Sequence, residues 1–114
     1  MSDTNIFTTG AQRSLDKDPS RLSLIPIEAL EACGRAWAEG EAKYGRDNWL
    51  KGIPQTNLLE HAIRHIYTYL RGNSTEDDLG HAMWNIVTAI YQEVNRPDMD
   101  DRPKYNDYPA PLDI

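Results

Sequence analysis

Apolar residues recur every three or four positions through the middle of the chain, which is the spacing of amphipathic helices. The first such segment runs from Pro26 to about Tyr44, and Gly45 follows it as a natural helix end. Proline suits the first position of a helix because its missing N–H would be unpaired there anyway. We therefore predict a first helix from Pro26 to Tyr44. Its apolar stripe consists of Ile27, Leu30, Cys33, Trp37 and Tyr44.

A second helix is predicted between Asn57 and Gly72. Asn57 is a favourable N-cap, and Glu60 three residues later is close to a capping box. Gly72 and Asn73 are residues at which helices commonly end. The expected buried positions are Leu59, Ala62, Ile63, Ile66 and Leu70, and the polar positions are His61, Arg64, His65 and Thr68.

A third helix follows, with Ser74 or Thr75 as its cap and Pro97 just beyond its end, where a proline cannot continue the helix. Asp77 or Asp78 stands in its first turn, where a negative charge is favourable. The expected apolar positions are Leu79, Ala82, Met83, Ile86, Ile90 and Val94, and the polar stripe is Asp78, His81, Asn85, Thr88 and Gln92.

No strand pattern or internal repeat accompanies these segments, so the predicted fold is all-α, a three-helix core with extended N- and C-terminal arms. Residues 1–20 are polar without an apolar period, and residues 97–114 hold four of the seven prolines. We expect a flexible N-terminal arm over residues 1–20, a helical domain over residues 21–96 and a Pro-rich C-terminal arm over residues 97–114.

Three helices make a thin core, and three tryptophans and six tyrosines are many for so small an interior. Small scaffolds often gain stability by pooling the apolar faces of several chains. The expected assembly is a homo-oligomer, either a dimer or a tetramer.

Composition narrows the function classes. The formal charge of -6, from 12 basic and 18 acidic residues, argues against a nucleic-acid polymer as partner, because its backbone attracts basic surface. The one cysteine, Cys33, cannot form an internal disulfide, which suits a reducing compartment. No apolar run approaches the roughly 18 residues of a membrane span, and the N-terminus lacks a signal-type apolar core. We expect a cytoplasmic protein without a membrane partner.

Histidines form the first candidate site. His61 and His65 stand four residues apart on one helical face, a spacing that can chelate a metal, and Asp78 and His81 could add ligands. Arg64 projects between the two histidines and would repel a cation. A metal site, a phosphate site and a solvated surface are therefore the three interpretations.

The second candidate site is the segment EAKYGRDNWLKG, where the first helix ends. Lysine and arginine bind phosphate oxygens, and an aromatic ring stacks on a base for roughly 1 to 3 kcal/mol. The segment favours a nucleotide site, although Trp49 would serve equally as a core or oligomer anchor. The residues concerned are Lys43, Tyr44, Arg46, Asn48, Trp49 and Lys51.

These residues belong to a wider resemblance. From LIPIEALEACGRAWAEGEAKYGRDNWLKG through LLEHAIRHIYTYLRG and DLGHAMWN to DDRP, the chain resembles the phage and bacterial family of dATP/dGTP diphosphohydrolase N-terminal domains, over about residues 14–104. That family looks related to the all-α nucleotide pyrophosphohydrolases of the MazG type, whose E-E-x-x-E and E-x-x-D boxes hold magnesium. The most specific matching residues are Gly40, Lys43, Tyr44, Gly45, Asn48, Trp49, Arg64, His65, His81 and Asn85.

The chain departs from this pattern in its carboxylates. Where the first box should lie it has Glu60, His61 and Arg64, and where the second should lie it has Asp78 and His81. Magnesium prefers oxygen ligands, which arginine and histidine cannot supply, although both can bind phosphates directly. This departure from the family pattern leads us to expect nucleotide binding without a metal or other cofactor. The expected binding residues are Lys43, Tyr44, Arg46, Asn48, Trp49, His61, Arg64, His65, His81 and Asn85.

Three functions follow from these observations. The first is that of a small nucleotide-binding protein without catalysis, similar to viral proteins that sequester cyclic-nucleotide signals of bacterial antiphage immunity such as CBASS, Thoeris and Pycsar, in the host-cell cytoplasm. The alternative is the enzyme of the family name, which would cleave dATP or dGTP to the monophosphate and pyrophosphate with Mg²⁺ or Mn²⁺ on Glu60, Asp77 and Asp78. An adaptor protein without a small ligand is the third.

Overall fold

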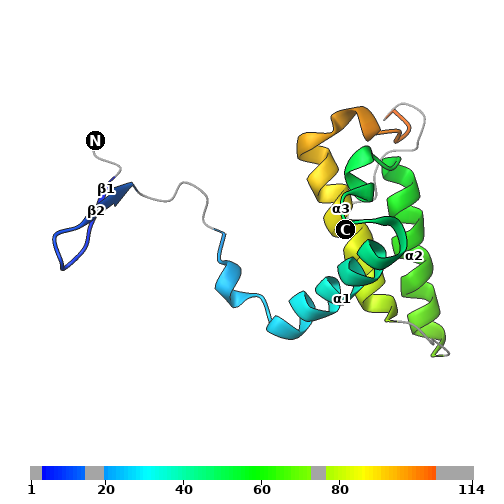
Figure 1. Cartoon of the computed structure of the whole chain (residues 1–114), viewed down its shortest axis with the longest axis horizontal. Coiled ribbons are helices and arrows are strands. Elements are labelled where there is room, and N and C mark those ends of the chain that lie inside the picture. Colours follow the sequence, from blue (N-terminus) through cyan, green and yellow to red (C-terminus); the bar gives the residue numbers. More distant parts are fainter. Residues whose placement is uncertain (1–3, 15–19, 73–76, 105–114) are drawn as a thin grey trace.

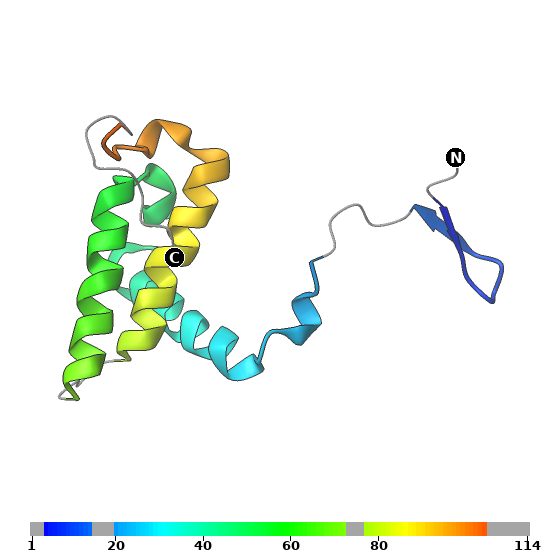
Figure 2. The same ribbon diagram turned by 180° about the vertical axis from the view of Figure 1, so that it is seen from behind.

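A computed structural model describes residues 4–14, 20–72 and 77–104. In this part of the chain the body consists of the helices α1 (Ile27–Tyr44), α2 (Gln55–Arg71) and α3 (Asp78–Asn95). Figures 1 and 2 show α2 and α3 side by side and antiparallel, with α1 crossing α3 at its N-terminal half. The all-α prediction is confirmed.

A small hairpin precedes the helices. Strand β1 (Thr4–Ile6) pairs antiparallel with β2 (Gln12–Ser14), and Thr4 lies opposite Ser14. No strand was predicted here, because three-residue strands are too short to show a period of two. The hairpin lies apart from the helical body in Figure 1 and contributes no buried residue.

The first helix lies within one residue of its predicted bounds. Pro26 is the N-cap of α1 instead of its first residue, and the helix ends at Tyr44 as predicted, where Gly45 adopts a φ of 90°. A positive φ is accessible to glycine at little cost, so Gly45 lets the chain turn sharply away from the helix axis. The turn leads into the short 3-10 helix η2 (Asn48–Lys51), which forms one wall of the site described below.

The predicted start of the second helix was wrong. Helix α2 begins at Gln55, so Asn57 lies within its first turn instead of capping it. Its first turn is hydrogen-bonded to a residue far along the chain. The Asp101 carboxylate accepts from the backbone N–H of Thr56 at 2.9 Å and from the Thr56 hydroxyl at 2.7 Å. A carboxylate at a helix N-terminus satisfies free N–H groups and opposes the helix dipole. No local sequence rule could reveal a cap supplied 45 residues later.

Helix α3 is capped by Asp77, whose Oδ1 accepts from the backbone N–H of Gly80 at 3.1 Å. The caps proposed from the sequence, Ser74 and Thr75, lie outside the described residues. The end of the helix at Asn95 agrees with the prediction, and a 3-10 helix, η3 (Pro97–Met99), follows directly.

The interior between α2 and α3 is polar. Thr88 and Gln92 are 0% and 1% exposed, whereas only one buried hydrophobic residue in the described part is larger than alanine, namely Leu58. Gln92 holds the chain before α2 in place: it accepts from the backbone N–H of Ile53 at 2.9 Å and donates to its carbonyl at 2.7 Å. The remaining buried residues are Ala36, Gln55, Ala62, Asp78, Gly80, Ala82, Asn85 and Ala89.

The predicted buried face of α2 and α3 therefore needs correction. Ala62 and Ala82 are buried as expected, but the large aliphatic residues of the same stripes face outward, and the stripe expected to be polar surface on α3 is buried. Amphipathic spacing tells which residues share a face, and it does not tell which chain covers that face. We call the exposed set the outer apolar face: Leu59, Ile63, Ile66, Leu70, Leu79, Ile86, Ile90 and Val94.

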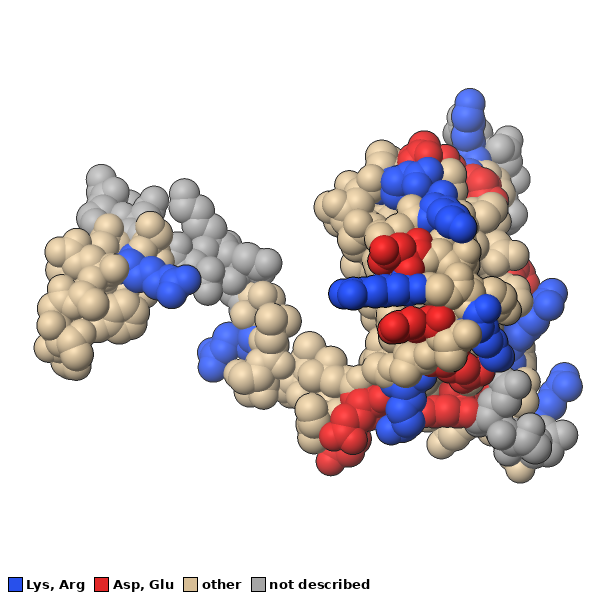
Figure 3. All heavy atoms as spheres, in the orientation of Figure 1, with Lys and Arg blue, Asp and Glu red and all other residues tan. Residues whose placement is uncertain are grey.

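The charged surface is mixed in sign. Figure 3 shows basic and acidic side chains interspersed over the helical body, without a large area of one sign on the visible face. Among the described residues, no helix combines the length and the apolar character needed to cross a membrane.

Candidate functional site

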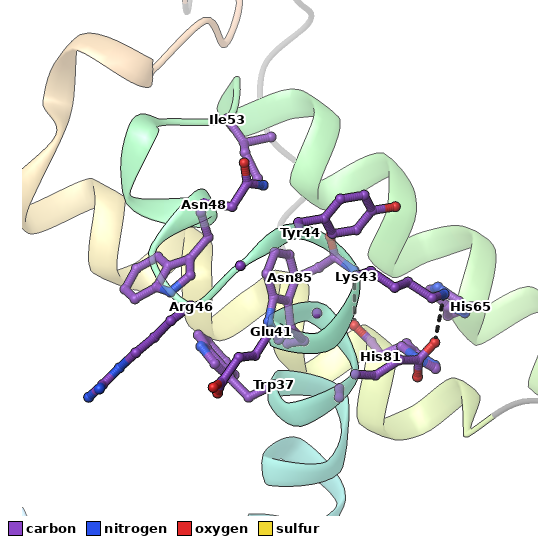
Figure 4. A pocket seen from close by; sticks show the side chains of 16 residues that line it. Trp37, Glu41, Lys43, Tyr44, Arg46, Asn48, Ile53, His65, His81 and Asn85 are labelled. Carbon is purple, nitrogen blue, oxygen red and sulfur yellow. Dashed lines mark hydrogen bonds and ion pairs between the residues drawn. The ribbon is translucent and has the colours of Figure 1, made fainter.

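A cavity of about 300 Å³ opens between the C-terminal half of α1, the η2 segment and the middle of α3 (Figure 4). Pockets that bind small molecules have volumes from about 300 to 1,000 Å³, so the cavity can enclose one ring system and leave the rest of a ligand at its mouth. We call it the tryptophan pocket, because Trp37, Trp49 and Trp84 all line it.

The three tryptophans are packed against one another. Trp37 meets Trp49 edge to face with ring centroids 5.6 Å apart and meets Trp84 at 5.4 Å in a tilted arrangement. Trp49 also meets Tyr91 edge to face at 4.8 Å. Such pairs each contribute about 0.5 to 1.5 kcal/mol beyond the area they bury, so they hold the wall in one arrangement. A fixed aromatic wall suits a flat, apolar ligand group.

Two histidines form the polar side of the pocket. The rings of His65 on α2 and His81 on α3 stack with centroids 5.0 Å apart and an interplanar angle of 21°. His65 Nδ1 lies 2.8 Å from the buried carboxylate of Asp78, and His81 Nε2 lies 2.8 Å from Glu39 on α1. Each ring is thus oriented by a carboxylate, which fixes the direction in which it can meet a ligand.

Glu39 connects the histidine pair to the basic rim of the pocket. Its second oxygen accepts from Lys43 Nζ at 3.0 Å, one helical turn later on α1. The hydrogen bond from Lys43 and the contact with His81 hold the pKa of Glu39 below its ordinary value. A negative carboxylate therefore lies between two groups that could bind a phosphate. An anionic ligand would have to compete with it for both.

The remaining pocket residues predicted from the sequence surround this centre. Asn85 is buried and its Nδ2 donates to the His81 carbonyl at 2.9 Å. Tyr44 is exposed at the mouth, and the Arg46 side chain extends away from the cavity in Figure 4. Eight of the ten predicted binding residues line the pocket, namely Lys43, Tyr44, Arg46, Asn48, Trp49, His65, His81 and Asn85.

The other two predicted residues, His61 and Arg64, lie elsewhere. They line a separate open groove at the N-terminal part of α2, together with Glu60 and Asp101. Four residues along a helix amount to a displacement of about 6 Å, which is enough to put His61 beyond the reach of the pocket that His65 lines. His61 and His65 share a helical face, as predicted, but they belong to two separate sites.

The candidate metal ligands do not converge. Asp78 is bonded to His65, Asp77 caps α3 and pairs with Arg35 at 2.9 Å, and Glu60 lies in the separate groove. In residues 4–14, 20–72 and 77–104, no three His, Cys, Asp or Glu side chains come together as a metal site would need. Magnesium requires several oxygen ligands around one point. Glu60, Asp77 and Asp78, as arranged in the structure, therefore do not fit a magnesium ion.

Sequence reasoning missed Trp84 and the role of Glu39. Trp84 stands three residues after His81 on α3, so helical spacing alone would have placed both on one side. Glu39 and Lys43 are four residues apart on α1, the spacing of an ion pair. Neither signal shows that α1 and α3 bring these groups together, because that depends on how the helices pack.

Fold and cavity together define a small all-α protein whose aromatic pocket opens beside lysine and histidine side chains. Residues 9–102 match the family model described as dATP/dGTP diphosphohydrolase, N-terminal, and the chain belongs to this family. The family name connects the chain with the handling of purine deoxynucleotides. Comparison with the curated proteins and with the solved structures gave no match.

Proposed function

We propose that this protein binds a nucleotide in the tryptophan pocket and holds it without hydrolysis. In this proposal it is a phage-type protein, a homo-oligomer in the host cytoplasm, that sequesters a cyclic-nucleotide signal of bacterial antiphage defence. The observation that carries the proposal is the meeting of an aromatic wall with Lys43 and two histidines at one cavity. These are the groups that a base and a phosphate need.

The base would occupy the aromatic part. Trp37, Trp49 and Trp84 offer an apolar wall, and base-to-ring stacking contributes roughly 1 to 3 kcal/mol without selecting one base. The amides of Asn48 and Asn85 also line the cavity. An amide carries both donors and acceptors, so these two side chains are candidates for recognising a base edge.

The phosphates would lie at the mouth. Lys43 and Arg46 belong to the rim, and His81 shares the Glu39 carboxylate with Lys43. A phosphate group placed near Lys43 can accept charge-assisted hydrogen bonds like those that Glu39 accepts in the structure. The geometry therefore supports a site in which a phosphate of the ligand competes with the Glu39 carboxylate for Lys43 and His81.

The proposal that the nucleotide is not hydrolysed rests on the positions of the carboxylates. Metal-assisted cleavage of a phosphoanhydride needs a cation that neutralises the developing charge and a positioned water. Asp77 and Asp78 are hydrogen-bonded elsewhere and Glu60 lines the separate groove, so the three carboxylates do not share one point. A bound nucleotide would consequently remain intact.

The family name favours a second candidate, a metal-dependent diphosphohydrolase of dATP or dGTP. In that case Glu60 or Asp78 would have to move to share Mg²⁺ or Mn²⁺, and replacing Asp78 by asparagine would abolish turnover. Monophosphate formation that disappears in Asp78→Asn, with the fold intact, would favour the enzyme over the binding protein.

A pair of basic-residue variants tests the pocket. Lys43 lines the tryptophan pocket and Arg64 lines the separate groove, and both side chains are exposed. Calorimetry with each nucleotide of a panel should show Lys43→Ala weakening binding about tenfold, because a phosphate contact is lost. Arg64→Ala should bind like the wild type. Equal weakening by both variants would contradict the assignment of the site.

A further inference from the structure

The segment η2 supplies one wall of the tryptophan pocket, but it is too short to hold its own position. Its first two residues, Asn48 and Trp49, both line the pocket. A 3-10 helix of this length has few internal hydrogen bonds, and their geometry is poorer than in an α-helix. The places of these two side chains therefore depend on the contacts that η2 makes with the rest of the helical body.

The main polar contact comes from Arg96, the residue directly after α3. Its Nη1 donates to the backbone carbonyl of Leu50 at 3.1 Å and to that of Lys51 at 3.2 Å. These are the last two residues of η2, where backbone carbonyls lack partners within the helix and a positive charge is favourable. Arg96 itself does not line the pocket, so it acts on η2 from outside.

Asp98 fixes the direction of the Arg96 guanidinium. Its Oδ1 accepts from Arg96 Nε at 2.9 Å, and its Oδ2 accepts from Nη2 at 2.8 Å. A two-point pair of this kind sets the plane of the guanidinium. The pair leaves Nη1 for the two η2 carbonyls, so the hold on η2 is directional as well as charged.

The turn after η2 packs closely against the same arginine. Gly52 has a φ of 100°, and a Cβ atom there would lie 2.7 Å from Met99 Sδ and 3.1 Å from Arg96 Nη2. Glycine alone combines this conformation with this spacing. Before the turn, the Trp49 ring meets Tyr91 of α3 edge to face at 4.8 Å. The end of η2 is thus held between α3 and the segment that follows α3.

We propose that Arg96 is a positioning residue of the nucleotide site, whose guanidinium holds η2 so that Trp49 and Asn48 keep their places in the pocket wall. This inference rests on the proposed function, because these two side chains would meet the base. Lys43 and His81, which would meet the phosphates, lie on the long helices α1 and α3. Loss of the Arg96 contact therefore weakens the contacts to the base and leaves those to the phosphates in place.

The position of Trp49 can be followed without any nucleotide. The three tryptophans give three indole N–H signals in a nitrogen-15 NMR spectrum, and Trp49→Phe identifies the one that belongs to Trp49. Arg96→Ala should move this signal, because the indole ring shifts relative to the aromatic rings that it contacts. Arg102→Ala is the matched control and should leave it unchanged. Arg102 also pairs with an aspartate two residues away, but among the described residues its guanidinium donates only to Asp100.

Calorimetry with dATP, dGTP and cyclic dinucleotides measures the effect on binding. A nucleotide that the wild type binds should bind about tenfold more weakly to Arg96→Ala, because the wall is no longer preorganised. Its affinity for Arg102→Ala should equal that for the wild type. An equal tenfold loss of affinity for inorganic pyrophosphate, which has no base, would show a general loss of structure and contradict the proposal.

An unmoved Trp49 signal in Arg96→Ala, an equal movement in Arg102→Ala, or wild-type affinity of Arg96→Ala would overturn the positioning role. If the wild type binds no nucleotide, the proposed function fails, and the indole signal still decides whether Arg96 positions η2. If circular dichroism shows that Arg96→Ala does not fold, Arg96→Lys replaces it. A lysine amine cannot pair with Asp98 at two points, so this variant should move the same signal by a smaller amount. An unmoved signal would again contradict the proposal.

Discussion

Gln92 shows how single residues hold this small interior together. Its side-chain amide bonds both the N–H and the carbonyl of Ile53, and its Nε2 also donates to Gln55 Oε1 at 3.0 Å. Gln55 in turn donates to the Ala89 carbonyl at 2.8 Å. The chain that leads into α2 is therefore fixed to α3 by hydrogen bonds where other proteins use apolar contacts. Buried networks of this kind stabilise only when all members are satisfied.

Removing this amide should be costly. Gln92→Ala removes the hydrogen-bond partner of the Ile53 N–H, the Ile53 carbonyl and the Gln55 side-chain oxygen, and each unsatisfied buried group costs about 1 to 3 kcal/mol. We expect urea unfolding to show a loss of about 3 kcal/mol. Glu93→Ala, the next residue and an exposed one, should change stability little. Similar losses in both variants would contradict the role assigned to the amide.

Glu39 makes stability depend on pH in a defined direction. Its pKa is lowered from 4.5, first by the hydrogen bond from Lys43 and then by His81. A lowered pKa means that the folded state favours the ionised carboxylate, so the stabilisation is present above pH 4.5 and is lost as the pH falls through the folded-state value. Glu39→Gln should remove this contribution.

Urea midpoints between pH 7 and pH 3 measure this effect. The wild type should exceed Glu39→Gln at pH 7, and the difference should shrink below pH 4.5. Glu41→Gln, on the same helix and also at the pocket rim, is the control for removing one negative charge. A difference that stays constant over the whole range would show that the Glu39 carboxylate does not contribute by its charge.

At the scale of elements, α1 and α3 meet closely at Gly80. A Cβ atom at this position would lie 2.7 Å from the backbone carbonyl oxygen of Ala32 on α1 and 3.0 Å from the Asp77 side chain. Both neighbours are fixed, one by the helix backbone and one by capping α3. Gly80 thus sets the distance between the two helices that carry Glu39 and His81.

Gly80→Ala should push α1 away from α3. Overpacking of this kind costs about 1 to 3 kcal/mol, and it should also separate the Glu39 and His81 side chains. Gly34→Ala is the matched control, because nothing lies within 4 Å of its Cβ position in the middle of α1. That variant should gain about 1 kcal/mol from helix propensity. A Gly80→Ala protein as stable as Gly34→Ala would refute the close approach.

The helices themselves could be predicted because their signals are local. Pro26, Gly45 and Pro97 mark ends of α1 and α3 through the conformations that these residue types favour. The packing could not be predicted in the same way. The carboxylate that caps α2 comes from Asp101, and the burial of Gln92 depends on its meeting Ile53, 39 residues earlier.

The candidate site could likewise be predicted only where its residues lie close together in the sequence. The cluster around Lys43 and Trp49 lies within one segment, and the structure places it at one cavity. The histidines required knowledge of the helix packing, which separates His61 from His65 and brings His65 to His81. A helical wheel cannot make that distinction, because it contains no neighbouring helix.

At the scale of the whole molecule, the described helices carry two separate surfaces, the outer apolar face and the tryptophan pocket. The outer apolar face and the tryptophan pocket share no residue. A nucleotide bound in the tryptophan pocket would therefore leave the outer apolar face uncovered.

Recovery of a bound nucleotide tests the central claim most directly. The wild-type protein is incubated with deoxynucleoside triphosphates and cyclic nucleotides plus magnesium and then filtered, and the retained protein is denatured and both fractions are chromatographed. We predict that one nucleotide class leaves the filtrate and returns from the denatured protein with its phosphates intact. Accumulation of a monophosphate and pyrophosphate, or the retention of no nucleotide at all, would contradict the account.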